Sequence, residues 1–243
     1  MISARHKKPL RTHLTFATCL AIVASLLAAA TVAGAGTPCN PYRSSQNGTY
    51  QAGTVGYPSA YPTGVQSYTE EYDPYVSGLS GIGTSMSVML AYNNTLWGQF
   101  GWNKHKSGST FVREIFQEHR DGMGNDFWNT WSGRTVWTST NYEITYNPSN
   151  KHLDYFVNGS QYSDLGTNWT PNNYEVFSET QDLADQMPGN VTSHALFAST
   201  YVSLHGISGW SAPSGDTVHF YSPTSYALKV GSNEYDTWDT NCP

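Results

Sequence analysis

Apolar and polar residues alternate with a period of two through most of the chain after residue 84, and turn-forming residues interrupt this pattern at short intervals. Such alternation is typical of strands that have one face in a core and the other toward solvent. Many short strands separated by frequent turns favour a sandwich over a helical fold. The sequence therefore predicts an all-β protein built as an antiparallel β-sandwich.

The expected elements of this sandwich follow from the same pattern, and we expect an arrangement of the concanavalin-like or jelly-roll type. The sequence predicts almost no helix, apart from a single turn at 180–186. Loops are expected at 147–151, within a hairpin, and at 158–160. The predicted strands are 85–92, 95–103, 110–118, 142–147, 153–157, 175–181, 195–204 and 217–230.

The N-terminal residues carry four basic side chains and no acidic ones, and an almost wholly apolar stretch follows at 14–33. This order is typical of a secretory signal peptide, and Ala33-Gly34-Ala35 supplies the small side chains that signal peptidase needs. Residues 1–35 are therefore predicted to be removed, which leaves a secreted, extracellular protein without a membrane segment. The alternative is an uncleaved anchor, because about 20 apolar residues can span a bilayer.

The chain that follows this leader has few charged residues, and most of these are acidic. The four basic residues of the leader leave eight Lys and Arg against 18 Asp and Glu, so nucleic acid is not expected as a partner. Charged residues make up 12% of the chain, against about 25% in ordinary globular proteins. Aromatic residues reach 14%, a balance typical of secreted β-proteins.

One folded domain is predicted behind the leader. Residues 36–83 are rich in Tyr, Pro, Gly and Ser, and we interpret them as an irregular N-terminal arm. Residues 84–243 are assigned to the β-sandwich. The length of the arm would suit a removable pro-segment, although nothing marks a second cleavage site.

Two cysteines remain once the leader, which contains Cys19, is removed. In an oxidising compartment Cys39 and Cys242 are expected to form a disulfide, because the two ends of a single domain commonly lie close together. Free thiols or pairing between chains are the alternatives.

Most catalytic chemistries lack their motifs in this sequence. The histidines after the leader show no paired ligand spacing, so no metal site is predicted. A Gly-x-Ser-x-Gly nucleophile motif, a phosphate loop and a dinucleotide fingerprint are also absent, and no cofactor is expected. Carboxylate chemistry remains.

The first candidate segment is 96–102. Alternation places Trp97, Gln99 and Gly101 on one face of this strand and Trp102 on the other. The glycine allows a ligand to approach the backbone closely. We expect Gln99 to act on a ligand, and Trp97 and Trp102 to contact it.

The second candidate segment carries Glu175 and Glu179, which share a face because they are four residues apart on a predicted strand. Two carboxylates on one buried face repel each other, so the pKa of at least one should be raised unless it reaches solvent. Glu114 and Glu118 form another pair with the same spacing.

A β-sandwich with an active Gln on one strand and an active Glu on another resembles the glutamic peptidases, both of the eqolisin and of the neprosin type. The Gln-x-Gly pattern of the eqolisin type is similar to Gln99 and Gly101, and its second acid four residues after the first is similar to Glu175 and Glu179. The run 186–189 is partly similar to a Gln-Met-Gly run in the neprosin type. The neprosin type uses two glutamates, and this sequence has Gln99 where the first would fall.

This resemblance implies that a glutamate acts in an acidic medium, first as general base on water and then as acid toward the leaving amine. Gln99 would position the water and donate an amide N–H to the oxyanion. The eqolisin spacing favours Glu175 as the catalytic glutamate and the Gln-Met similarity favours Glu179, and the preferred assignment is Glu179. The alternative is a structural role, in which Gln and Glu are solvated or pair with Tyr and Arg113.

Two further functions fit the sequence. A carbohydrate-binding or glycoside-hydrolysing sandwich would stack exposed aromatic rings on sugars and use a pair of carboxylates. A noncatalytic extracellular structural protein is the other alternative. The expected substrate is therefore an extracellular polypeptide or polysaccharide. Candidate sugar-stacking residues are Trp128, Trp131, Trp137 and Trp169.

Overall fold

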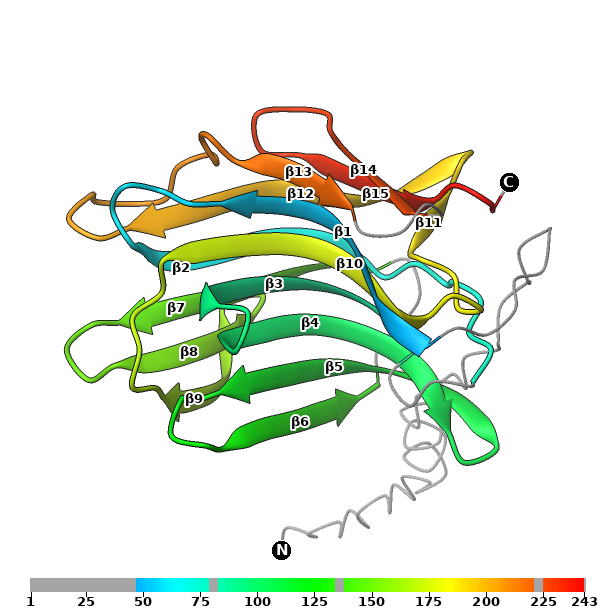
Figure 1. Cartoon of the computed structure of the whole chain (residues 1–243), viewed down its shortest axis with the longest axis horizontal. Coiled ribbons are helices and arrows are strands. Elements are labelled where there is room, and N and C mark those ends of the chain that lie inside the picture. The colour runs from blue at the N-terminus through cyan, green and yellow to red at the C-terminus, as the bar shows by residue number, and fades with distance from the viewer. Residues whose placement is uncertain (1–46, 79–82, 134–137, 221–224, 243) are drawn as a thin grey trace, which may run out of the picture. The chain divides into compact units, whose positions relative to one another are not determined.

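The computed structural model describes residues 47–78, 83–133, 138–220 and 225–242, and every regular element in these ranges is a β-strand (Figure 1). The predicted signal peptide lies outside the described residues. Within the described ranges, no helix has the length and apolar character that crossing a membrane requires. The strands are β1 (Asn47–Gly56), β2 (Pro62–Glu70), β3 (Thr84–Asn93), β4 (Leu96–Ser107), β5 (Thr110–Arg120), β6 (Asp126–Ser132), β7 (Ser139–Asn147), β8 (His152–Val157), β9 (Ser160–Gly166), β10 (Asn173–Asp182), β11 (Gly189–Asn190), β12 (Ser193–Leu204), β13 (Thr217–Phe220), β14 (Ser225–Lys229) and β15 (Tyr235–Asp239).

Two antiparallel sheets form the sandwich, which confirms the predicted fold class. Sheet A has seven strands in the order β13-β1-β10-β3-β4-β5-β6. Sheet B follows the order β14-β15-β12-β2-β7-β8-β9, and β11 pairs with β12 beside this path. Neighbours in a sheet come from distant parts of the chain, since β10 lies between β1 and β3 (Figure 1).

Large aromatic side chains fill the space between the two sheets. Phe100 of β4 in sheet A packs edge-on against Tyr142 and Tyr155 of sheet B, with ring centroids 5.6 and 5.5 Å apart. These three residues and Trp102 are fully buried in one core cluster. The core therefore fixes the inner face of β4, and the residues that alternate with Phe100 and Trp102 point to the outer face of sheet A.

The prediction of an irregular arm over 36–83 is wrong for most of the described part of that segment. β1 lies between β13 and β10 in sheet A, and β2 lies between β12 and β7 in sheet B. Small polar residues occupy buried positions in these strands, among them Thr54, Ser67 and Thr69, so the apolar alternation is weak. Pro62 begins β2, a position where the missing N–H is tolerated. The sandwich thus includes both strands.

Other strand predictions differ in smaller ways. The apolar pattern misses β6, β9 and β15; β6 is an edge strand whose side chains are mostly exposed and show no alternation. The segment predicted as one strand at 217–230 contains two strands, β13 and β14.

The predicted helical turn at 180–186 is replaced by the end of β10 and a turn in which Asp185 N donates to Asp182 O at 3.0 Å. Both predicted loops are confirmed. In the first, Lys151 N donates to Asn147 O at 2.8 Å and closes the turn between β7 and β8.

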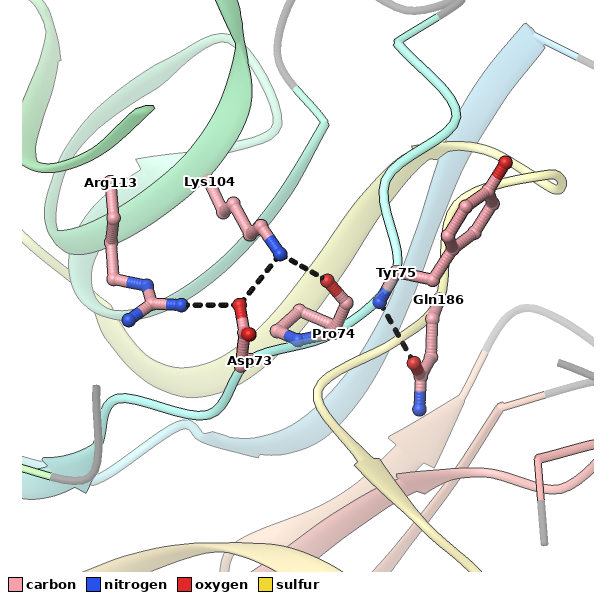
Figure 2. A network of polar contacts seen from close by, with 6 residues as sticks. All are labelled: Asp73, Pro74, Tyr75, Lys104, Arg113 and Gln186. Carbon is pink, nitrogen blue, oxygen red and sulfur yellow. Dashed lines mark hydrogen bonds and ion pairs between the residues drawn. The ribbon is translucent and has the colours of Figure 1, made fainter. Parts of the chain in front are cut away.

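The segment 71–78, between β2 and β3, is fixed to the inner face of sheet A by one carboxylate. Asp73 Oδ1 accepts hydrogen bonds from Lys104 Nζ at 2.6 Å and from Arg113 Nη2 at 2.7 Å (Figure 2). Lys104 Nζ also donates to Pro74 O at 2.7 Å. Burial holds the pKa of Lys104 below its ordinary value, although Asp73 acts in the opposite direction. The position of this segment therefore depends on pairing two buried cations.

The same segment is bound to the loop that follows β10. Gln186 Oε1 accepts from Tyr75 N at 2.9 Å (Figure 2). Gln186 N also donates to Tyr75 O at 2.8 Å. Asp185 Oδ1 accepts from Ser77 N and Ser77 Oγ at 2.7 and 2.6 Å. Segment 71–78 thus links β4 to the end of β10. These contacts give Gln186 a structural role.

Candidate active site

β3 runs between the two strands that carry the candidate residues. Met89 of β3 pairs with Glu175 of β10 on one side and with Gln99 of β4 on the other. Gln99 pairs in turn with Glu118 of β5. These four residues form one row across sheet A, on the face that points away from the core.

This outer face contains a cavity of about 620 Å³, within the usual size range for ligand pockets. Its lining runs across sheet A from β1 to β5, with β10, β3 and β4 between these two strands. The lining residues are Thr49, Gln51, Met89, Asn93, Asn94, Trp97, Gln99, Glu118, Arg120, Asn173, Glu175, Glu179 and Gln181.

Two glycines allow neighbouring strands to approach closely beside this cavity. A Cβ atom on Gly101 of β4 would lie 2.0 Å from Met86 O of β3, and one on Gly53 of β1 would lie 2.1 Å from Val176 O of β10. Glycine inside a strand is typical of a bend or of close backbone approach, and these strands are visibly curved in Figure 1. Carboxylates from different rows of the sheet, those of Glu175 and Glu179, line this one cavity.

Gln99 is held in place, and one of its two amide hydrogens makes no hydrogen bond to the described residues. The residue is 6% exposed, and its Nε2 donates to Ser87 Oγ of β3 at 2.9 Å. A side-chain amide has two N–H donors. The second is therefore suited to a ligand oxygen in the cavity.

Glu179 is held by two amide side chains. Gln51 Nε2 donates to its Oε2 at 2.7 Å, and Gln181 Nε2 donates to its Oε1. Burial raises the pKa of Glu179 to about 7, the two amide donors act against this shift, and the charge of Glu118 adds to it. Both carboxylate oxygens of Glu179 are thus already engaged.

Glu175 differs from Glu179 in its contacts. It is half-buried, lines the cavity and has no hydrogen-bond partner for its carboxylate among the described residues. Burial, followed by repulsion from Glu179, raises the pKa of Glu175 to about 7. Such a pair loses its protons in coupled steps. In weakly acidic solution one carboxyl can be ionised while the other keeps its proton.

One end of the cavity is formed by the next row of sheet A, in which Ala91 of β3 pairs with Asn173 and with Trp97. The guanidinium carbon of Arg120 lies 4.1 Å from the centroid of the Trp97 ring, and Arg120 Nε lies 3.1 Å from Asp126 Oδ1. Asn173 is 5% exposed, and its Oδ1 has no hydrogen-bond partner in the described part of the chain. A buried acceptor left unpaired costs about 1–3 kcal/mol. This oxygen is suited to accept a donor from a ligand.

The cavity contains four of the five residues that the sequence associated with chemistry or substrate, namely Trp97, Gln99, Glu175 and Glu179. Trp102 does not line the cavity, so the prediction that it contacts substrate is wrong. Its side chain is fully buried between the sheets, because alternation along β4 places it opposite Gln99.

The predicted disulfide between Cys39 and Cys242 stays a prediction, since Cys39 lies outside the described residues. Cys242 itself is 3% exposed.

Sequence reasoning missed several lining residues. Gln51 lies on β1, in the segment interpreted as an arm, and no sequence signal identified it. The position of Glu118 beside Gln99 could have been predicted from the hairpin of β4 and β5. A tight turn that pairs Ser107 with Thr110 fixes the register of the two strands, and in this register Gln99 lies opposite Glu118.

The sequence matches no protein-family model, and it matches no curated protein. Solved structures with a similar fold include two of scytalido-glutamic peptidase bound to transition-state analogues, with TM-scores of 0.60 and 0.59 and identities of 10% and 11%. A third is SCP-B, an eqolisin-family peptidase in complex with the tripeptide Ala-Ile-His, with a TM-score of 0.57 and 11% identity. Each alignment covers 80% of this chain and 100% of the other. The fold of this chain therefore resembles that of the glutamic peptidases.

Proposed function

We propose that this protein is a secreted glutamic-type peptidase that acts on extracellular polypeptides in weakly acidic solution, with Gln99 and Glu175 at its reaction centre. The observation that carries the proposal is the row of sheet A in which only Met89 separates these two residues, on the face that holds the cavity. Likeness of fold alone would not support an activity. The predicted leader supports the secreted location.

In the proposed reaction, Glu175 takes a proton from a water molecule, and the water oxygen attacks the carbonyl carbon of the scissile peptide bond. The amide N–H of Gln99 that Ser87 leaves unused donates to the oxygen on which negative charge develops. Because Ser87 and the surrounding strands hold Gln99, little reorganisation accompanies this step. Trp97 borders the same cavity and is proposed to contact the bound chain.

The contacts favour Glu175 over Glu179 as the base, which reverses the preference drawn from sequence. Glu179 gives both oxygens to Gln51 and Gln181, whereas the carboxylate of Glu175 is open to a ligand. Glu179 is proposed to act on Glu175 through its charge. The similarity of run 186–189 to the neprosin type favoured Glu179. Gln186 in this run instead bonds to the backbone of Tyr75, which gives it a structural role.

The test is hydrolysis of an acid-denatured protein substrate by the purified chain in weakly acidic buffer. Gln99→Ala should lower kcat by about 10² to 10³-fold, as expected for loss of one oxyanion donor. Gln161→Ala, which removes an exposed amide from β9 in the other sheet, is the matched control and should leave kcat unchanged. A wild-type chain that cleaves nothing, or full activity in Gln99→Ala, would contradict the proposal.

A glycan-binding function lacks comparable support. Trp169 is buried, and its Nε1 donates to Arg120 O at 2.8 Å. Trp131 packs partly against the core, and Trp137 lies outside the described residues. Trp128 is 43% exposed, but Phe116 stacks on it at 5.2 Å. A polysaccharide pull-down remains the appropriate test.

A further inference from the structure

Glu118 lies beside Gln99 on the side away from Glu175. It pairs with Gln99 across β4 and β5, is half-buried and lines the same cavity. Its carboxyl group has no hydrogen-bond partner among the described residues. Glu118 has no role in the proposed reaction of Gln99 and Glu175.

The charged groups around Glu118 come from three strands. Arg120 lies on the same strand, Asp126 on β6 and Glu179 on β10. Burial is the largest cause that raises the pKa of Glu118, Asp126 adds to the shift, and Arg120 acts against it. Glu118 and Glu179 repel each other. Burial among these groups therefore holds the pKa of Glu118 above its ordinary value.

Peptide hydrolysis needs a proton acceptor for the attacking water and a proton donor for the departing nitrogen. Glu175 and Glu118 lie at opposite ends of the row that contains Gln99. We propose that Glu118 is the general acid that protonates the leaving amine, a role that rests on the proposed peptidase function.

The protons balance in this scheme. Glu175 removes one proton from water, and the resulting hydroxide oxygen forms the new bond to the carbonyl carbon. The carbon–nitrogen bond then breaks as Glu118 gives its proton to the nitrogen. The products are a carboxylic acid and an amine, and Glu175 returns its proton through solvent while Glu118 takes one up.

A separate feature of this cavity also suits a peptide chain as its ligand. The unpartnered Oδ1 of Asn173 lies at the cavity end beside the row of Glu175. A main-chain N–H is a donor that fits this oxygen. Such a bond would anchor the substrate next to the reacting peptide group.

The experiment compares Glu118→Gln with wild type on a peptide and on a depsipeptide of the same sequence, in which an ester replaces the scissile amide. An alcohol leaves with much less need of a proton than an amine does. Glu118→Gln should therefore lower kcat on the peptide by about 10²-fold and leave ester hydrolysis nearly unchanged. Ester hydrolysis also reports that the variant is folded.

Glu114→Gln is the matched control. Glu114 lies on the same strand and face, is also half-buried, and lies outside the cavity, with its Oε1 3.7 Å from His105 Nδ1. It should not change either rate. Equal loss on both substrates in Glu118→Gln, or loss on neither, would overturn the role of Glu118 while leaving the peptidase function intact. Failure of the wild-type chain to cleave either substrate would instead overturn the peptidase function, and the role of Glu118 with it.

Discussion

Gln99 of β4 and Glu175 of β10 occupy one row of sheet A, each paired with Met89 of β3. The two residues are far apart in sequence, and the strand order of the sheet brings them to the same cavity. This arrangement leads to specific expectations for pH dependence, stability and activity.

Glu179→Gln should move the rising limb of the pH–rate profile to lower pH. Repulsion from Glu179 is one of the causes that raise the pKa of Glu175 to about 7, so removing that charge lets Glu175 ionise at lower pH. The measurement is kcat/KM on a peptide substrate across the acidic range. An unchanged profile would show that the two carboxyls do not interact.

Stability should fall as pH rises from about 4.5 toward about 7. The folded-state pKa values of Glu175 and Glu179 exceed the ordinary value of 4.5, so the folded protein binds more protons than the unfolded chain in this window. Their contribution is present in full below the unfolded pKa and is lost as pH passes the folded pKa, by an amount on the order of a few kcal/mol for the pair.

Urea unfolding at the two ends of this window tests that expectation. The double variant Glu175→Gln with Glu179→Gln should be more stable than wild type near neutral pH and similar to it at the acidic end. Equal stability of the two proteins at neutral pH would argue against raised pKa values.

Gly101→Ala should destabilise the sandwich by about 3 kcal/mol. The added methyl group would lie 2.0 Å from the backbone oxygen of Met86, which cannot move away as a flexible side chain would. Gly166→Ala on β9 is the control, since its nearest neighbour would be His152 Nε2 at 3.5 Å. Thermal unfolding of both variants gives the comparison, and a similar Tm for the two would contradict the close approach of β3 and β4.

Asp73→Asn should lower the free energy of unfolding by about 2–4 kcal/mol, because Lys104 and Arg113 would remain buried without their shared carboxylate. This range is set below that for a fully buried pair because the Asp73 side chain is 35% exposed. Asp126→Asn, which affects an exposed pair with Arg120, should cost less than about 1 kcal/mol. Similar losses in both variants would show that burial of the cations does not matter.

The inward and outward faces of β4 and β10 could be predicted from sequence because large residues mark the core face. Phe100 and Trp102 define it on β4, and Glu175 and Glu179 share the opposite face of sheet A, as expected. The strands β1 and β2 could not be predicted in this way, since their buried positions include Thr54 and other small polar residues that resemble loop composition.

The candidate site was only partly predictable for a related reason. Local alternation identifies which residues share a face of one strand, but it does not say that β10 inserts between β1 and β3. The contact between Gln51 and Glu179 depends on this long-range pairing. By contrast, the pairing of Gln99 with Glu118 depends on a single tight hairpin.

The most direct measurement of the central claim is kcat/KM for Glu175→Gln and Glu179→Gln on the same peptide in weakly acidic buffer. Glu175→Gln should lose at least about 10³-fold, because no base remains to activate water. Glu179→Gln should keep most of its activity at a shifted pH, because its carboxylate already binds Gln51 and Gln181. Abolished activity in Glu179→Gln together with retained activity in Glu175→Gln would contradict the assignment of Glu175 as the base.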